Sequence, residues 1–153
     1  MTTLFYKAAC MKRHLLNMPS YVAIWLTIAV STFRIFCTPC KTWSKACGIF
    51  QAETLKTPAY NERELKTLAR FVFKLKNYFP WKVRCLEQAL TVHYLLKKRG
   101  YNHTLYFGML KDDRNQWRAH AWVRCGDTWV IGYQPEQDYT VVGTYAAIVS
   151  EHD

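Results

Sequence analysis

The chain has 153 residues, of which 50% are hydrophobic and 16% aromatic, and its formal net charge is +10. This length suits a single domain with its own core, and the aromatic content excludes an intrinsically disordered chain. The charge is unevenly distributed, because no Asp or Glu precedes Glu53. Such a basic surface favours an acidic partner, whether an acidic peptide, an anionic lipid or a nucleic acid.

The first predicted element is an uncharged stretch over residues 15–33, whose centre at residues 21–30 is strongly apolar. A membrane-spanning helix needs about 20 mostly apolar residues, and this stretch has the length but contains Pro19 and several polar residues. A cleaved signal peptide is disfavoured, because no small-residue cleavage site follows. We expect a buried helix here, and a membrane-associated helix is the less favoured alternative.

Cysteine occurs six times, at Cys10, Cys37, Cys40, Cys47, Cys85 and Cys125. Cys37 and Cys40 form a C-x-x-C pair, but a zinc site needs two further ligands in a recognisable spacing. A redox motif would follow a strand, whereas this region is predicted to be helical. We therefore predict no metal, no cofactor and reduced thiols.

Residues 48–60 are predicted to connect two elements, because Thr57-Pro58 interrupts regular structure. A second helix is predicted over residues 62–78, with apolar residues at helical spacing and basic residues between them. No helix-turn-helix, RNP or zinc-finger pattern accompanies this basic helix, so we expect a solvated face and no nucleic-acid binding. The chain also has no Gly-rich phosphate loop and is not expected to bind ATP as a P-loop enzyme.

A third helix is predicted from Cys85 to Arg99, after Pro80 and before Gly100. Cys85 then lies at the helix N-terminus, where unpaired backbone amides and the positive dipole end stabilise a thiolate. Cys85 also shares a helical face with apolar residues. From the helix alone, a buried structural cysteine is therefore the competing interpretation.

Strands are predicted over residues 104–110, 118–124 and 128–133, followed by a short strand near 139–142 and a frayed or helical tail at 144–149. Gly126-Asp127 indicates a hairpin between the second and third strands. His120 alternates with Trp122 and Arg124 on one face of its strand. Without further information, His120 is equally consistent with a half-buried structural histidine.

These motifs resemble a known family when they are taken together. The sequence C-L-E-Q-A-L-T-V-H-Y-L-L-K-K-R-G-Y from Cys85, a strand ending in F-G-M-L, and the hairpin motif A-H-A-W-V are similar to the lasso-peptide leader peptidases. These enzymes belong to the transglutaminase-like cysteine proteases. The resemblance extends over about residues 81–142, and the earlier helical, basic region is similar in character only.

The resemblance implies an α+β fold of the transglutaminase-like, papain-like kind, in which N-terminal helices precede a Cys-bearing helix packed on an antiparallel sheet. Residues 1–153 would form one domain, with a helical N-terminal region over 1–60 and a catalytic core over 61–153. Cys85 would be the nucleophile and His120 the general base. The implied reaction removes the leader from a ribosomally made precursor in the cytoplasm, as in bacteriocin biosynthesis.

The third catalytic residue departs from the family pattern. Family members that carry one often have an Asp at a position corresponding to about Gly132 here. Asp127 lies at the hairpin tip, about 20 Å from His120 at ~3.3 Å per strand residue, so we do not expect it to orient the ring. Gln134, Glu136 and Asp138 follow the strand and are the candidates, and an amide or a backbone carbonyl can also serve.

The resemblance also implies partners. The substrate would be a lasso precursor peptide, and a separate ATP-dependent cyclase would close the freed core. We further expect a separate winged-helix protein to hold the leader, because residues 1–50 lack the strand pattern of such a domain. Two alternatives remain: another transglutaminase-like acyltransferase or amidase, and a catalytically inactive peptide-binding module.

Overall fold

The computed structural model describes residues 21–57, 60–135 and 137–149. Within these ranges the chain forms helices, short 3-10 helices and a single sheet. The helices are α2 (Tyr21–Cys37), α3 (Cys40–Ser44), η1 (Lys45–Cys47), α4 (Glu62–Leu75), η2 (Lys76–Tyr78) and α5 (Cys85–Lys98). The strands are β1 (Ile49–Phe50), β2 (His103–Lys111), β3 (Trp117–Cys125), β4 (Thr128–Ile131) and β5 (Thr140–Ala147).

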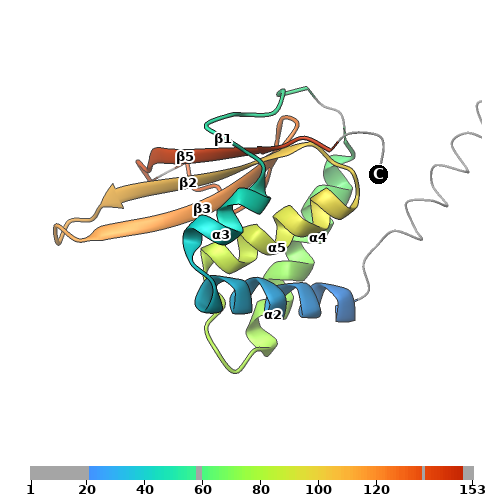
Figure 1. Cartoon of the computed structure of the whole chain (residues 1–153), viewed down its shortest axis with the longest axis horizontal. Helices are drawn as coiled ribbons and strands as arrows, with labels where there is room; N and C mark the ends of the chain where they lie inside the picture. The colour runs from blue at the N-terminus through green and yellow to red at the C-terminus, as the bar shows by residue number, and fades with distance from the viewer. Residues whose placement is uncertain (1–20, 58–59, 136, 150–153) are drawn as a thin grey trace, which may run out of the picture.

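The sheet has the order β1-β5-β2-β3-β4, and every neighbouring pair is antiparallel. The helices lie together on one side of it, with α5 directly against the sheet and α2 on the far side of α5 (Figure 1). The predicted α+β architecture, with a Cys-bearing helix packed on an antiparallel sheet, is therefore confirmed.

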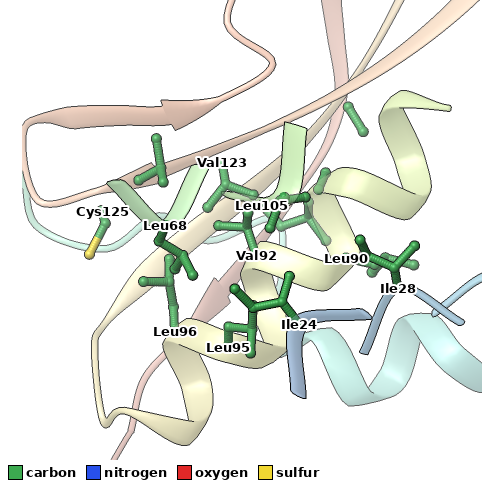
Figure 2. Packing of buried hydrophobic residues seen from close by; sticks show 14 of the residues in the cluster. Ile24, Ile28, Leu68, Leu90, Val92, Leu95, Leu96, Leu105, Val123 and Cys125 are labelled. Atoms are coloured by element: carbon green, nitrogen blue, oxygen red, sulfur yellow. The ribbon is translucent and has the colours of Figure 1, made fainter. Parts of the chain in front are cut away.

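The core lies between α5, its two neighbouring helices and the inner face of the sheet (Figure 2). Val92 and Leu96 of α5 are fully buried there, against Leu105 of β2 and Val123 of β3. These strand residues are directly paired across the sheet, so they share its inner face. His120, Trp122 and Arg124 alternate with inner-face residues and therefore belong to the outer face, as the alternation predicted.

Helix α4 begins at a cap and buries one face. The Asn61 side chain accepts a hydrogen bond of 3.0 Å from the Arg63 amide, and Leu65, Leu68 and Val72 are buried. The predicted helix over residues 62–78 is confirmed, except that its last turn tightens into a 3-10 helix, η2.

Helix α2 is buried on one face only, which corrects the expectation of a buried helix. Ile24, Ile28 and Ser31 are fully buried, whereas Val22 and Phe36 are 66% and 72% exposed. Helices α4 and α5 contact one side of α2, so its opposite apolar side is largely exposed within the described residues. Among those residues, the structure contains no helix with the length and apolar character to cross a membrane.

The segment over residues 48–60, which was predicted to be only a connection, contains a short strand and contacts the sheet. Ile49 and Phe50 form β1 and pair with β5 at the sheet edge. The following segment crosses the outer face, where the buried Arg124 guanidinium donates to the Glu53 carboxylate at 3.0 Å and to the Thr54 carbonyl at 2.9 Å. A buried charge is stable only when it is paired and hydrogen-bonded, so this network fixes the segment to the sheet.

The C-terminal part also differs from the prediction. Strand β5 continues to Ala147, and no helical tail forms over residues 144–147. These residues pair with β2 on one side, which satisfies their backbone groups in the sheet rather than in a helix.

A buried histidine pair lies between α5 and β2. His103 Nδ1 is 2.7 Å from the Tyr101 carbonyl, and His103 Nε2 is 2.8 Å from His93 Nδ1. Because a carbonyl oxygen only accepts, His103 donates from Nδ1 and then accepts the Nδ1–H of His93. Burial lowers the pKa of His93 to about 3 and that of His103 to about 4, so both rings are neutral at physiological pH.

Candidate active site

Cys85 is the first residue of α5, as predicted. The Glu87 carboxylate accepts a hydrogen bond of 3.1 Å from the Arg84 amide and closes the turn that precedes the helix. In the first backbone hydrogen bond of the helix, the Gln88 amide donates to the Arg84 carbonyl at 3.2 Å. The amides of Cys85 and Leu86 precede this bond, so they are available to an anion at the helix head.

The half-buried Cys85 thiol faces strand β3. Its Sγ lies 4.0 Å from the carbonyl oxygen of Ala119, the residue immediately before His120. Helix α5 packs along the inner face of β2 and β3 (Figure 1). The fold therefore brings the head of α5 to the part of β3 that carries the predicted base.

The His120 ring is oriented by a backbone carbonyl. His120 Nε2 lies 2.6 Å from the carbonyl oxygen of Gly132, the residue that follows β4. A carbonyl oxygen cannot donate, so Nε2 must carry the hydrogen in this contact. In the neutral ring this tautomer leaves the lone pair on Nδ1, which is the nitrogen that can accept a proton.

Gly132 has a backbone conformation that depends on its lack of a side chain. Its φ is +81°, in the region that L-residues with a Cβ avoid. A Cβ at this position would also lie 2.5 Å from the Ala121 carbonyl oxygen and 3.1 Å from Trp122 Cβ. An Asp does not fit here without moving β3 or β4, and the group of Gly132 that contacts the His120 ring is its backbone carbonyl.

Tyr139 completes the surroundings of His120. Its ring stacks on the His120 ring with centroids 5.0 Å apart and an interplanar angle of 27°. Burial, and secondarily the charge of nearby Cys85, raises the pKa of the Tyr139 phenol. Tyr139 is therefore close to both predicted catalytic residues, although it lies in the segment before β5.

The other candidates for the third residue have different positions. Gln134 and Asp138 line a cavity beside His120, but the hydrogen-bond partner of Nε2 is Gly132. Glu136 lies outside the described residues. Asp127 is exposed in the β3–β4 turn, where its carboxylate accepts a hydrogen bond of 3.4 Å from the Thr128 hydroxyl. As predicted, it is at the opposite end of β3 from His120.

Gly108 is a further residue on which the site depends. It pairs directly with His120 across β2 and β3. A Cβ on Gly108 would lie 2.5 Å from the Trp122 ring and 3.1 Å from Tyr139 Cβ, so glycine makes room for both aromatic residues. The signal in the sequence was the glycine inside the F-G-M-L strand, since a strand glycine often marks a close approach. No sequence signal distinguished Tyr139.

The remaining described cysteines differ from Cys85. Cys47 and Cys125 are buried, and burial raises the pKa of each thiol to about 12. Cys37 and Cys40 are exposed at the junction of α2 and α3. Among the described residues, no group of three or more His, Cys, Asp or Glu side chains is arranged to hold a metal ion.

Comparison with known families identifies the fold family. Residues 35–144 match the transglutaminase-like superfamily, and this range contains both predicted catalytic residues. The chain belongs to the transglutaminase-like superfamily. This superfamily includes cysteine proteases and acyltransferases, which share a thiol nucleophile. No curated protein and no solved structure is significantly similar to the chain.

Proposed function

We propose that this transglutaminase-like protein is a cysteine endopeptidase that removes the leader peptide from a lasso-peptide precursor. The observation that supports it best is the position of Cys85 at the head of α5, with Sγ 4.0 Å from the residue next to His120. The orientation of His120 by the Gly132 carbonyl gives the ring the tautomer that a general base requires.

The proposed reaction has two steps. His120 Nδ1 takes the Cys85 thiol proton, and the thiolate attacks the carbonyl carbon at the leader–core junction. The free amides at the head of α5 stabilise the oxyanion of the tetrahedral intermediate. His120 then gives its proton to the core amine, which leaves, and the leader stays on Cys85 as a thioester. In the second step, His120 deprotonates a water molecule that hydrolyses the thioester and releases the leader.

Selective alkylation of the thiols tests the activation of Cys85. Iodoacetamide is added at neutral pH, and the modification of each cysteine is followed over time by peptide mass spectrometry. Cys37 and Cys40 are internal controls, because they are more exposed than Cys85. Among the described residues, neither is assigned a histidine base. We expect Cys85 to react fastest and to slow down in His120→Ala. A Cys85 that reacts more slowly than Cys37 would contradict an activated nucleophile and favour an inactive peptide-binding module.

The nature of the products separates hydrolysis from acyl transfer. The purified protein is incubated with a precursor peptide, with and without an added primary amine. The masses of the products are then measured by mass spectrometry. A leader with a free carboxylate supports a peptidase. A leader joined to the added amine supports the alternative of a transglutaminase-like acyltransferase, which also uses a thioester on Cys85.

We also propose that a separate leader-binding protein presents the substrate to this chain and that an ATP-dependent cyclase uses the freed core. Tethering by the leader would raise the local concentration of the scissile bond to roughly millimolar. The net charge of +10 suits an acidic leader or partner, and this attraction weakens with salt. Cleavage is measured with and without the partner at low and high salt. Efficient, salt-insensitive cleavage by this chain alone would contradict the requirement for a partner.

A further inference from the structure

A cavity of about 290 Å³ opens beside His120 on the outer face of the sheet. We name it the aromatic groove and define it by Tyr106, Trp122, Trp129, Tyr133, Tyr139 and Val141. The helices cover the opposite face, so the groove is separate from the core described above (Figure 1). His120 also lines it, which makes the groove continuous with the candidate active site.

The walls of the aromatic groove consist of stacked rings. The ring centroids of Trp129 and Tyr133 are 4.1 Å apart, and the two rings have an interplanar angle of 5°. The ring centroids of Tyr106 and Trp122 are 5.7 Å apart, with an interplanar angle of 1°. Tyr133 and Val141 are 44% and 48% exposed, so part of this apolar surface is open to solvent. Aromatic faces of this kind bind another ring or a large aliphatic group by offset stacking and by burial of apolar area.

The inner end of the groove is fixed by the rest of the site. The Tyr106 hydroxyl donates to the Glu53 carboxylate at 2.7 Å and accepts from Arg124 Nε at 2.8 Å, so it is already used inside the sheet network. Trp122 rests over Gly108, where a side chain would collide with its ring. The groove is therefore formed before any substrate arrives, which lowers the entropy lost on binding.

We propose that the aromatic groove is a specificity pocket that takes one large apolar side chain, preferably aromatic, of the peptide substrate. This inference rests on the proposed function, because it assigns the groove to the substrate of Cys85 and His120. The cavity is at the lower end of the size of small-molecule sites, about 300–1,000 Å³, and so suits a single side chain rather than a whole cofactor. Tyr139 stacks on His120 and also lines the groove, so a side chain bound there lies beside the proposed general base.

A binding experiment tests the groove without any catalysis. Cys85→Ala protein is titrated with N-acetylated amides of phenylalanine, leucine, lysine and asparagine, and binding is followed by saturation-transfer NMR. We expect saturable binding of the phenylalanine amide, weaker binding of the leucine amide, and no saturable binding of the other two. Stronger binding of the lysine amide would overturn the proposal, since Asp138 and the ring faces would then form a cation site.

Variants of the exposed wall make the test specific. Tyr133→Ala and Val141→Asp change side chains that are partly exposed, so both variants are expected to fold, and thermal unfolding checks this. Each should weaken binding of the phenylalanine amide by about tenfold, the loss expected for one stacking or apolar contact. Phe36→Ser on the exposed face of α2 is the matched control and should bind as the parent protein does. Equal binding by Tyr133→Ala, Val141→Asp and the control would overturn the proposal.

A cleavage experiment connects the groove to the substrate. Wild-type protein is incubated with a complex library of natural peptides, and the new termini are sequenced by mass spectrometry. We expect a large apolar residue at one fixed position relative to the cut, and we expect this preference to disappear in Tyr133→Ala while cleavage continues. Cleavage without any such preference contradicts the pocket and leaves the peptidase intact. Absence of cleavage is the result expected if the leader-binding partner is required, and the amide titration then decides whether the groove binds apolar side chains.

Discussion

Gly132→Ala separates the orienting carbonyl from the general cost of replacing a glycine. At φ +81° an alanine loses about 1–2 kcal/mol of stability relative to an ordinary conformation. Its Cβ would also lie 2.5 Å from the Ala121 carbonyl oxygen, which is part of β3 and cannot rotate away. Overpacking of this kind costs about 1–3 kcal/mol, so the expected loss of unfolding free energy is about 2–5 kcal/mol.

The effect on activity follows from the displacement of the carbonyl. Relief of the clash moves Gly132 away from β3, and the contact of 2.6 Å with His120 Nε2 lengthens. A misplacement of about 1 Å in a catalytic group can cost about 100-fold in rate, so we expect kcat to fall by about that factor. The tautomer is a second observable, because ¹⁵N NMR of His120 should show a hydrogen on Nε2 in wild type and a mixture of tautomers in Gly132→Ala.

Gly100→Ala is the matched control. Gly100 also has a positive φ, +74°, but no heavy atom lies within 4 Å of the Cβ that would be added. Its backbone amide donates a hydrogen bond of 3.0 Å to the Lys97 carbonyl, at the opposite end of α5 from Cys85. Its alanine variant should therefore lose only the backbone cost of about 1–2 kcal/mol and keep the wild-type kcat. Urea unfolding and peptide cleavage measure both variants. Equal stability losses, equal kcat and an unchanged His120 tautomer would refute the role of the Gly132 carbonyl.

Three further outcomes are expected. Cys85→Ala and His120→Ala should each abolish cleavage, because nucleophile and base act as a unit. The far-ultraviolet circular dichroism spectrum of each variant should stay unchanged. A Cys85→Ala protein that cleaves at the wild-type rate would exclude the thiol mechanism. Asp127→Asn should change kcat less than twofold, about the scatter of such assays, because the side chain lies at the far end of β3; a large loss measured by peptide cleavage would place Asp127 in the reaction. Acid should destabilise the fold, because burial lowers the pKa of His93 to about 3 and of His103 to about 4, well below an unfolded value of 6.5. Their contribution to stability is present above pH 6.5 and is lost as the pH falls toward 4 for His103 and toward 3 for His93, by about 2 kcal/mol per histidine between pH 7 and pH 5. Urea midpoints that are equal at pH 7 and pH 5 would contradict this linkage.

The sequence by itself determined the elements that depend on local patterns. A proline before Cys85 and a glycine after Arg99 bound α5, because caps and breakers act within one or two turns. Strict alternation assigned His120 and Trp122 to one face of β3, because side-chain direction in a strand has a period of two. The family resemblance then joined these elements into a transglutaminase-like fold.

Burial was less well determined by local pattern. Helix α2 is as apolar as a buried helix, yet Val22 and Phe36 are exposed, because its burial depends on how many layers pack around it. Strand β5 extends to Ala147 because β2 offers its backbone groups as partners along that length. Both outcomes depend on contacts between segments that are distant in the chain.

The third member of the site shows most clearly what only the tertiary structure decided. A search along the sequence finds candidate side chains, and so it pointed to Gln134 and Asp138. The group that contacts His120 Nε2 is the backbone carbonyl of Gly132, brought to 2.6 Å by the path of the chain at the end of β4. Every residue has a backbone carbonyl, so residue identity cannot distinguish the one that orients the ring. Its selection depends on the register of β4 against β3, which forms only when the sheet is assembled.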